Sequence, residues 1–244
     1  MDHTKLPSPY RRDSERRPQQ CQYVTESPIY LPRPENPGDR LFFDVLHERR
    51  SRREGGQPIA ADVSSLLWHC AKTKATSIEE SGFLWQHRAS PSGGGRHPVD
   101  IVLGNYQGDA SALYLYDPLA HALARLGDLD GHQLKTFVNT IDQVLPVGEA
   151  VIVWFVAQFD RTLSKYADGE SLVWLDTGAL LATVYLVAEA SGLNCCAIGI
   201  TGEPWISRIL RAPELLEGVG GCLLWTRASQ RTAGPSAGPL TGVD

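Results

Sequence analysis

The sequence predicts an α+β fold, one sheet with helices on both sides, and two stretches carry that prediction. Residues 151–159 form a continuous β-branched and aromatic run, which is typical of a central strand buried on both faces. Residues 179–190 are apolar nearly all round, as in a helix at the centre of a core or at a subunit interface. Helical and strand patterns alternate along the chain around these two stretches.

The N-terminal part of the chain changes character near residue 38. Residues 1–37 are rich in Pro, Arg, Gln and Ser, so they disfavour a helix and lack core residues. We expect them to form a flexible tail, one able to lie on a partner subunit. From Asp39 an apolar face at helical spacing predicts a helix that ends in the basic run Arg49–Arg53, and residues 61–70 predict a second helix.

The remaining elements follow a loop rich in Gly and Ser at residues 88–98. They are strands at 99–103, 113–116 and 121–126 (the last two a hairpin), a helix at 133–144, a strand at 195–200, a short helix at 204–210 and a last strand at 221–225. Residues 228–244 are again rich in Gly, Pro, Ser and Thr, so we expect a second flexible tail. The folded domain should therefore span residues 38–227.

Composition narrows the class of protein. A net charge of -5 argues against nucleic-acid binding, which calls for a basic surface. The five cysteines show no CxxC or Cys/His spacing, which indicates free thiols in a reducing cytoplasm and no metal site. The start of the chain lacks the apolar core of a signal peptide, and the apolar run at 179–190 is too short to span a membrane. We expect a soluble, cytoplasmic protein.

The basic run Arg49-Arg50-Ser51-Arg52-Arg53 has two interpretations. Cations are favourable at the C-terminal end of a helix, so the run can be a solvated helix end. It can also be an anion pocket, because arginine matches phosphate oxygens bidentately and the serine hydroxyl adds a donor.

The loop Pro91-Ser92-Gly93-Gly94-Gly95 is either a plain flexible connection or a place where the backbone approaches a flat ligand closely. No Lys-Ser/Thr follows the glycines, and no G-x-G-x-x-G opens a helix after a strand. Neither an NTPase nor a Rossmann dinucleotide site is indicated.

Lys165 and Tyr166 place two proton-carrying side chains next to each other between the predicted central strand and the apolar helix. An ordinary surface pair is the default interpretation. Between two buried elements, however, loss of solvent would turn the lysine amine into a usable base near neutral pH.

The order of these motifs along the chain carries a resemblance. The motifs are Arg49-Arg-Ser-Arg-Arg53, Pro91-Ser-Gly93 with Pro98, Leu113-Tyr-Leu-Tyr-Asp-Pro118, Lys165-Tyr166 and Asp176-Thr-Gly178, the last taken as the start of the apolar helix. Together they resemble the FMN-dependent nitroreductase superfamily, and most of all the thiazoline/oxazoline dehydrogenases (azoline oxidases) of azole-containing peptide biosynthesis. The resemblance covers roughly residues 40–226.

The resemblance implies a nitroreductase-like fold with a central, mostly antiparallel sheet, bound FMN, and an intertwined homodimer with two sites at its interface. For FMN it implies that Arg49, Ser51 and Arg53 contact the phosphate and the ribityl chain, and that Arg227 is a second phosphate contact. It implies that Pro91, Ser92 and Gly93 of the partner subunit lie on the flavin ring. It also implies that the backbone of Ile198 and Gly199 faces the flavin. It implies Lys165 and Tyr166 as the catalytic pair.

Some positions differ from the family pattern. Ala167 follows the Lys-Tyr pair where the family has Gly, and no arginine follows within residues 169–171. Ala179 stands where the family often has His, and Ala182-Thr183 replace a Gln-Asn pair. These differences bear on the substrate and on the direction of the redox reaction rather than on flavin binding.

Three functions remain open on this evidence. The first is an FMN oxidase that aromatises a thiazoline or oxazoline in a peptide or carrier-bound intermediate, with a cyclodehydratase or carrier protein presenting the substrate. The second is an NAD(P)H-dependent reductase of nitro, quinone or enone compounds. The third is a non-catalytic scaffold subunit of a biosynthetic complex.

Overall fold

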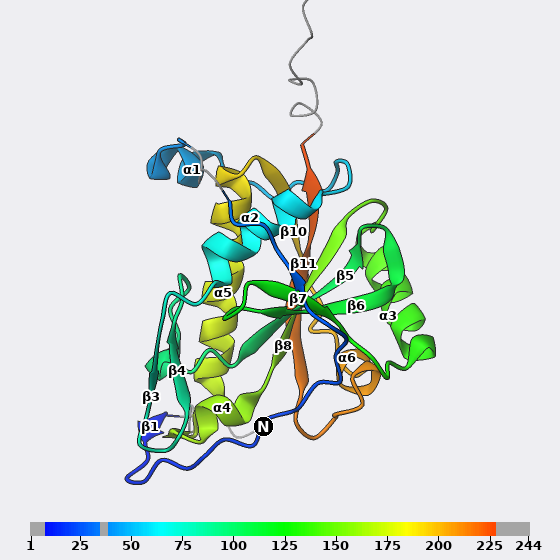
Figure 1. Ribbon diagram of the computed structural model, residues 1–244. Helices are drawn as coiled ribbons and strands as arrows, with labels where there is room; N and C mark the ends of the chain where they lie inside the picture. Colours follow the sequence, from blue (N-terminus) through cyan, green and yellow to red (C-terminus); the bar gives the residue numbers. More distant parts are fainter. Residues whose placement is uncertain (1–7, 35–38, 228–244) are drawn as a thin grey trace, which may run out of the picture.

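A seven-stranded antiparallel sheet forms the centre of the computed structural model, which describes residues 8–34 and 39–227 (Figure 1). Its strands, from one edge to the other, are β10 (Leu193–Ile198), β11 (Glu217–Thr226), β8 (Val151–Ala157), β5 (Val99–Tyr106), β6 (Asp109–Asp117), β7 (Ala122–Arg125) and β2 (Ile29–Tyr30). Each strand pairs antiparallel with its neighbour. The predicted α+β fold with a central antiparallel sheet is therefore confirmed.

Strand β8 lies in the middle of this sheet, and all seven of its residues are buried, as the continuous apolar run predicts. The strand is shorter than expected, however. It ends at Ala157, and Phe159–Leu163 form the short helix α4. Gln158 stands at the change of direction, where its buried side chain accepts a hydrogen bond from the Cys21 amide and donates one to Asp100. These two hydrogen bonds hold Gln158 where the chain changes direction, so the strand ends before it.

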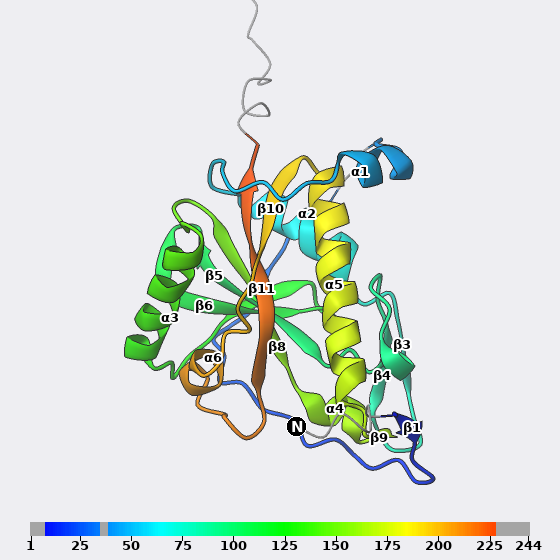
Figure 2. The ribbon, with the colours of Figure 1, turned by 180° about the vertical axis from the view of Figure 1, so that it is seen from behind.

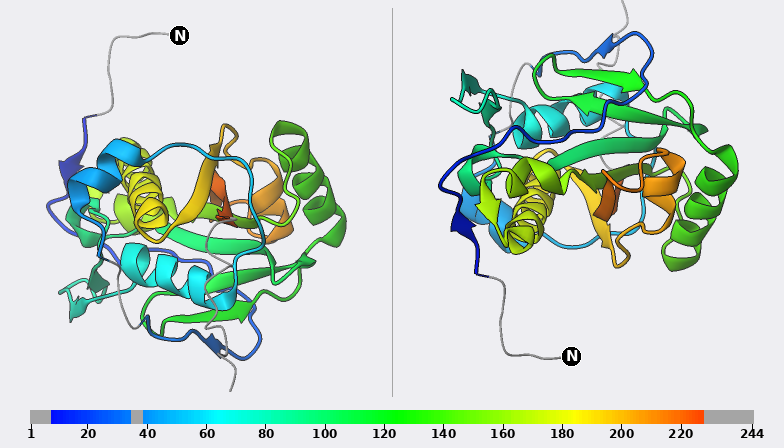
Figure 3. Two further views of the ribbon diagram at one scale, coloured as in Figure 1. Left: turned by 90° about the horizontal axis from the view of Figure 1, so that it is seen from above. Right: turned by 90° about the horizontal axis from the view of Figure 1, so that it is seen from below.

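Helices cover both faces of the sheet (Figures 1 and 3). One face carries α1 (Phe42–Glu48), α2 (Ala60–Ala71) and α5 (Glu170–Ala190); the other carries α3 (Gly131–Val144) and α6 (Trp205–Ile209). Alternate residues of β8 serve the two layers, since successive side chains of a strand point to opposite faces. Val153 and Phe155 belong to the cluster under α2 and α5, whereas Ile152 and Trp154 belong to the cluster under α3 and α6.

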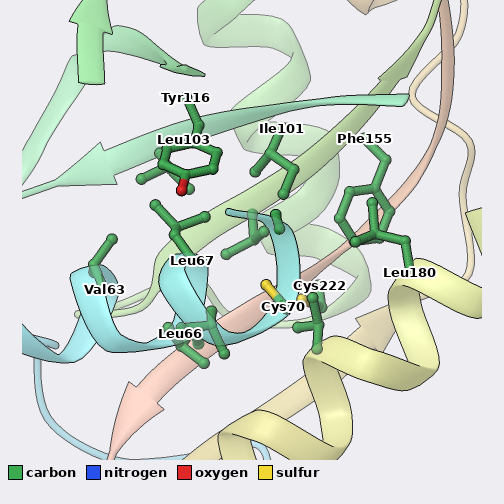
Figure 4. Packing of buried hydrophobic residues seen from close by; sticks show 14 of the residues in the cluster. Val63, Leu66, Leu67, Cys70, Ile101, Leu103, Tyr116, Phe155, Leu180 and Cys222 are labelled. Carbon is green, nitrogen blue, oxygen red and sulfur yellow. The ribbon is translucent and has the colours of Figure 1, made fainter. Parts of the chain in front are cut away.

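The core between the sheet and α2 and α5 is close-packed (Figure 4). Leu67 of α2 points toward Leu103 of β5, and Leu180 of α5 lies beside Phe155 of β8. Leu67, Leu103 and Phe155 are each 0% exposed. This packing fixes α5 against the sheet, and α5 in turn positions most of the residues predicted to form the site.

Helix α5 begins two turns earlier than expected, at Glu170 rather than near Asp176. With 21 residues it is long and apolar enough to cross a membrane by length and composition. One side of the helix, which includes Val173 and Val184, is buried in the core of the domain, so α5 is one of its layers. Other apolar positions of the helix face outward: Trp174 is 42% exposed and Leu175 is 68% exposed.

Residues 8–34, expected to form a flexible tail, lie along the core of this same chain. Strand β1 (Tyr10–Arg11) pairs with β9 (Tyr166–Ala167), and β2 forms an edge of the main sheet. Arg16 adds an ion pair with Asp160 of α4. Prolines exclude a helix here but permit very short edge strands, whose partners cannot be seen in the local sequence. The other predicted tail residues, 1–7 and 228–244, lie outside the described residues, as do residues 35–38.

A second unexpected element is the hairpin of β3 (Ala75–Ile78) and β4 (Leu84–His87). Figures 1 and 2 place it beside the lower half of α5, next to β1. All four residues of β3 are exposed, so the strand has no alternating apolar pattern to reveal it. The hairpin matters for the site because its turn carries Glu79.

Candidate functional site

The basic segment after α1 lies against the C-terminal half of α5. The Arg49 guanidinium lies over the Tyr185 ring, 5.3 Å from its centroid, and Ser51 Oγ shares a hydrogen bond of 3.0 Å with Tyr185 Oη. Arg49 and Arg53 are both exposed. Neither forms a salt bridge with any other described residue, which leaves two guanidinium groups open to an external anion.

Tyr185 also connects this segment to the end of β10. Its Oη accepts a hydrogen bond of 2.6 Å from the Ala197 amide. Burial raises the pKa of Tyr185, and the hydrogen bonds with Ser51 and Ala197 only partly oppose this shift. The predicted residues Ile198 and Gly199 follow directly. Gly199 is exposed, and apart from its two chain neighbours no described residue has an atom within 4 Å of the place where a Cβ would be. The backbone here is open to a flat ligand.

Glu189 binds three other arginines at this end of α5. Its carboxylate is 2% exposed and binds Arg40 at 3.0 Å, Arg227 at 2.6 Å, and Arg52. Burial alone would raise the pKa of Glu189, but hydrogen bonds from Arg227, Arg40 and Arg52 lower it to about 2. Arg227 also donates to Asn194 at 3.0 Å. Its predicted role as a phosphate contact stays a prediction, because in this structure the side chain is committed to Glu189.

The loop Pro91–Gly93 is tied to the other half of α5. Ser92 Oγ donates to Asp176 at 2.5 Å, the Gly93 amide donates to the same carboxylate at 3.0 Å, and Ser92 Oγ accepts from the His97 amide at 2.8 Å. Asp176 therefore stands inside α5 as an acceptor for the loop, and the expectation that it opens the helix is wrong. Burial raises the pKa of Asp176, partly offset by the hydrogen bonds from Ser92 and Gly93.

The same loop meets Lys165 and Tyr166. Gly94 has φ of 63°, and a Cβ at this position would lie 2.6 Å from Tyr166 Oη and 3.3 Å from Lys165 Cδ. Only glycine lets the loop come so close in this conformation. The pair is held from the other side by β1, because the Arg12 amide donates to the Lys165 carbonyl at 2.9 Å and Arg11 pairs with Tyr166.

Lys165 is ion-paired rather than alone. Its Nζ lies 2.8 Å from Glu79 Oε1 and 3.5 Å from Glu15 Oε1. Glu79 also binds the buried Arg96 at 2.5 Å. Burial would raise the pKa of Glu79, but Lys165 and Arg96 together lower it. These ion pairs were not foreseen, because neither the hairpin nor the ordered N-terminal segment that supplies the two carboxylates was predicted.

The predicted site residues therefore form two groups within one chain. Arg49, Ser51 and Gly199 gather near Tyr185, whereas the Pro91–Gly93 loop and the Lys165–Tyr166 pair gather near Asp176. Tyr185 and Asp176 are nine residues apart on α5, or about 14 Å at 1.5 Å per residue. Sequence reasoning missed Tyr185, Glu79, Glu15 and Glu189, whose only signal would have been their contacts in space.

The family model described as "Nitroreductase family" matches residues 48–223. The chain belongs to the nitroreductase family. No curated protein sequence matches the chain significantly.

Three solved structures show the same fold. A protein described as a nitroreductase from Ralstonia eutropha is 20% identical, with a TM-score of 0.59 over 88% of this chain and 98% of that one. A chain of the Escherichia coli microcin synthetase McbBCD complex with truncated pro-MccB17 bound is 16% identical, with a TM-score of 0.54 over 74% and 71%. A nitroreductase from Desulfovibrio desulfuricans in complex with FMN is 15% identical, with a TM-score of 0.50 over 83% and 94%.

Proposed function

We propose that this protein is an FMN-dependent oxidoreductase that aromatises a thiazoline or oxazoline ring in a peptide or carrier-bound intermediate. One observation carries the proposal: the Lys165–Tyr166 pair, which matches the pair of azoline oxidases, lies against Gly94, the residue that follows the Pro91–Gly93 segment assigned by the same resemblance to the flavin ring. Two motifs that are far apart in the sequence thus lie in contact, which supports a shared role in ring oxidation.

The residues present fit FMN. Arg49 and Arg53 are exposed cations without a carboxylate partner among the described residues, and Ser51 adds a hydroxyl beside them. This is the chemistry that binds a phosphate. The open backbone at Gly199 allows close approach of a flat ring. Bound FMN would supply the hydride acceptor that the oxidation of an azoline requires.

Lys165 and Tyr166 would handle the substrate proton. Lys165 Nζ donates to Glu79 at 2.8 Å, so a proton taken up at Lys165 would be relayed to Glu79 along this hydrogen bond. That transfer is uphill, since Lys165 and Arg96 lower the pKa of Glu79. The Tyr166 hydroxyl, held between Gly94 and β1, is the second group placed to exchange the proton. A positioned acid or base of this kind accelerates a reaction about 10²- to 10⁴-fold.

We further propose that two copies of the chain build each site. Nitroreductase family members are commonly dimers. The two groups of predicted residues are separated along α5, and the outward apolar residues of α1 and α5, such as Phe43 at 79% and Leu175 at 68% exposure, would be covered by a second subunit. Loop Pro91–Gly93 of one subunit would then complete the site of the other. A cyclodehydratase or carrier protein would present the substrate.

A second function, NAD(P)H-dependent reduction of nitro, quinone or enone compounds, is favoured by the residues after the pair. Ala167 and residues 169–171 lack the glycine and arginines of the azoline oxidases. The same missing glycine and arginines would also suit the third function, a non-catalytic scaffold subunit.

Two measurements on the purified, FMN-supplemented protein test the proposal. In air, a thiazoline-containing peptide should lose two hydrogens, as detected by mass spectrometry. In anaerobic stopped flow, NADPH should reduce the flavin only slowly. Fast reduction by NADPH with no peptide oxidation would assign the protein to the reductases, and a protein that binds no FMN would assign it to the scaffolds. Light scattering that shows a monomer with bound FMN would contradict the shared site.

A further inference from the structure

A cavity of about 570 Å³ lies beside Arg88, Arg96 and His97, which flank the Pro91–Gly93 loop in sequence. Its walls come from residues 20–25 of the N-terminal segment, from β4 and from the C-terminal end of β6. The volume falls in the range of small-ligand pockets, about 300–1,000 Å³. The proposed FMN and proton-handling roles do not use this cavity.

Most charges in its walls are satisfied within the chain. Arg161 binds Asp100 at 2.6 Å, and Arg96 binds Glu79 at 2.5 Å. Asp117 accepts the Leu119 amide at 2.8 Å and so caps the turn after β6. Arg161 and Arg96 are thus neutralised by carboxylates, whereas Asp117 keeps a negative charge and forms no salt bridge with another described residue.

Among the described cations in the cavity walls, Arg88 has no carboxylate partner. Its Nε and Nη2 donate to one neutral acceptor, Gln86 Oε1, at 3.1 and 2.8 Å. It forms no salt bridge with any other described residue. Burial, and then the charge of Arg161, lower the pKa of Arg88 to about 10. Burying a cation whose only partner is a neutral amide costs free energy of desolvation, and an anion bound to the cation would offset that free energy.

The adjacent His97 adds no charge. Burial, and then Arg88, lower the pKa of His97 to about 3, so the ring is neutral at physiological pH. Because the Gln86 carbonyl can only accept, the hydrogen bond of 3.1 Å between them places the ring hydrogen on Nε2. Arg88 is therefore a single, uncommitted positive centre.

The remaining walls combine a few amide and hydroxyl side chains with an apolar and aromatic surface formed by Tyr23, Phe83, Leu84, Leu115, Tyr116 and Leu119. A ligand that suits them has an apolar body. A single guanidinium fork matches one carboxylate bidentately. A phosphate, with up to two charges, would meet one uncommitted cation and the carboxylates of Asp100 and Asp117.

We infer that this cavity binds a small organic carboxylate, with the carboxylate on Arg88 and the apolar body among the side chains of β4 and β6. Arg88 also lines a small cavity next to Pro91, Ser92 and Asp176. The bound carboxylate would thus lie directly behind the loop assigned to the flavin ring. The inference concerns binding alone and holds whichever redox reaction the protein performs.

The test measures binding of benzoate to the full-length protein by isothermal titration calorimetry, with saturating FMN present so that any flavin phosphate site is filled. Benzamide has the same ring without the charge. Replacing Arg88 by Gln should weaken benzoate binding about tenfold or more, the scale of a lost charge-assisted hydrogen bond. It should leave benzamide binding unchanged. Arg17→Gln, a change at an exposed arginine outside the cavity, is the matched control.

Arg88→Lys keeps the charge but not the fork, so its affinity for benzoate should fall between those of the wild type and Arg88→Gln. If Arg88→Gln loses its native circular dichroism, the affinity of Arg88→Lys for benzoate tests the inference in its place. The inference is overturned if benzoate does not bind at millimolar concentration, if Arg88→Gln and Arg88→Lys both bind it as tightly as the wild type, or if inorganic phosphate binds more tightly than benzoate.

Discussion

The two halves of α5 differ in whether they leave positive charge free. Beside the C-terminal half, three arginines are bound to Glu189, but Arg49 and Arg53 are exposed and form no salt bridge with the other described residues. Beside the N-terminal half, Lys165 and Arg96 are largely buried and are bound to Glu79, which they share.

This difference separates two tasks. Free, exposed guanidinium groups can bind an anion that comes from solution, as a cofactor phosphate does. Cations already neutralised by internal carboxylates contribute little to such binding, but they are held in one geometry and can position a proton. We therefore expect changes near the C-terminal half to alter cofactor affinity, and changes near the N-terminal half to alter turnover.

The largest expected effect tests what keeps the C-terminal half in place. Replacing Glu189 by Gln removes the buried anion that holds three arginines, and the free energy of unfolding should fall by about 3 kcal/mol. Because the pKa of Glu189 is lowered, its stabilisation is complete above the ordinary value of 4.5 and is lost as the pH falls toward about 2. Denaturant unfolding at several pH values should show wild type and variant converging in acid.

Glu48→Gln is the control for this change. Glu48 binds the same Arg40 but its side chain is 55% exposed, so its removal should cost about 1 kcal/mol or less. Equal losses in the two variants would show that the Glu189 cluster does not fix this end of the helix.

The second effect concerns turnover at the N-terminal half. Lys165→Ala and Tyr166→Phe should each lower turnover about 10²-fold or more, which is about 2.7 kcal/mol or more in the barrier, while FMN stays bound. The double variant should lose less than the product of the two losses, since the pair acts as a unit. Steady-state kinetics with bound flavin measured by absorbance would check this. Near-wild-type turnover in both single variants would make the pair structural.

The third effect concerns cofactor affinity at the C-terminal half. Arg49→Ala and Arg53→Ala should each weaken FMN binding by about 1.5–3 kcal/mol, which is roughly tenfold or more in the dissociation constant. Fluorescence titration of FMN would measure this. Arg50→Ala, at an exposed arginine in the same segment without a predicted contact, should have a smaller effect. Equal effects of all three changes would mean that the segment acts only through its overall charge.

What could be predicted from the sequence follows from how local each signal is. The buried strand β8 could be predicted from an unbroken apolar run, and helices α2 and α3 from apolar residues at helical spacing. The start of α5 was missed because Asp176, a polar residue before an apolar run, resembles a helix start. Its carboxylate serves instead as the acceptor for Ser92 and Gly93, which are 84 and 83 positions away in sequence.

The candidate site shows the same limit. The motifs at Arg49, Ser92 and Lys165 could be located, but the groups that control their charge could not. Glu79 sits in an exposed hairpin without an apolar pattern, and Glu15 in a proline-rich segment with two-residue strands. Such partners are fixed by backbone pairing and ion pairs across the fold, which leave no periodic trace in the sequence.

The pairing of β1 with β9 has a consequence for how the protein is made. It joins Tyr10 to Ala167, so the chain must emerge from the ribosome as far as β9 before the first strand finds its partner. Closing so long a loop carries an entropy cost that early local structure cannot offset. We expect β9, which carries Tyr166 and follows Lys165, to pair with β1 late in folding. Pulsed hydrogen exchange at the Arg12 amide, which donates to the Lys165 carbonyl, would time this step during refolding. A newly synthesised chain would then possess a folded core before it possesses a working site.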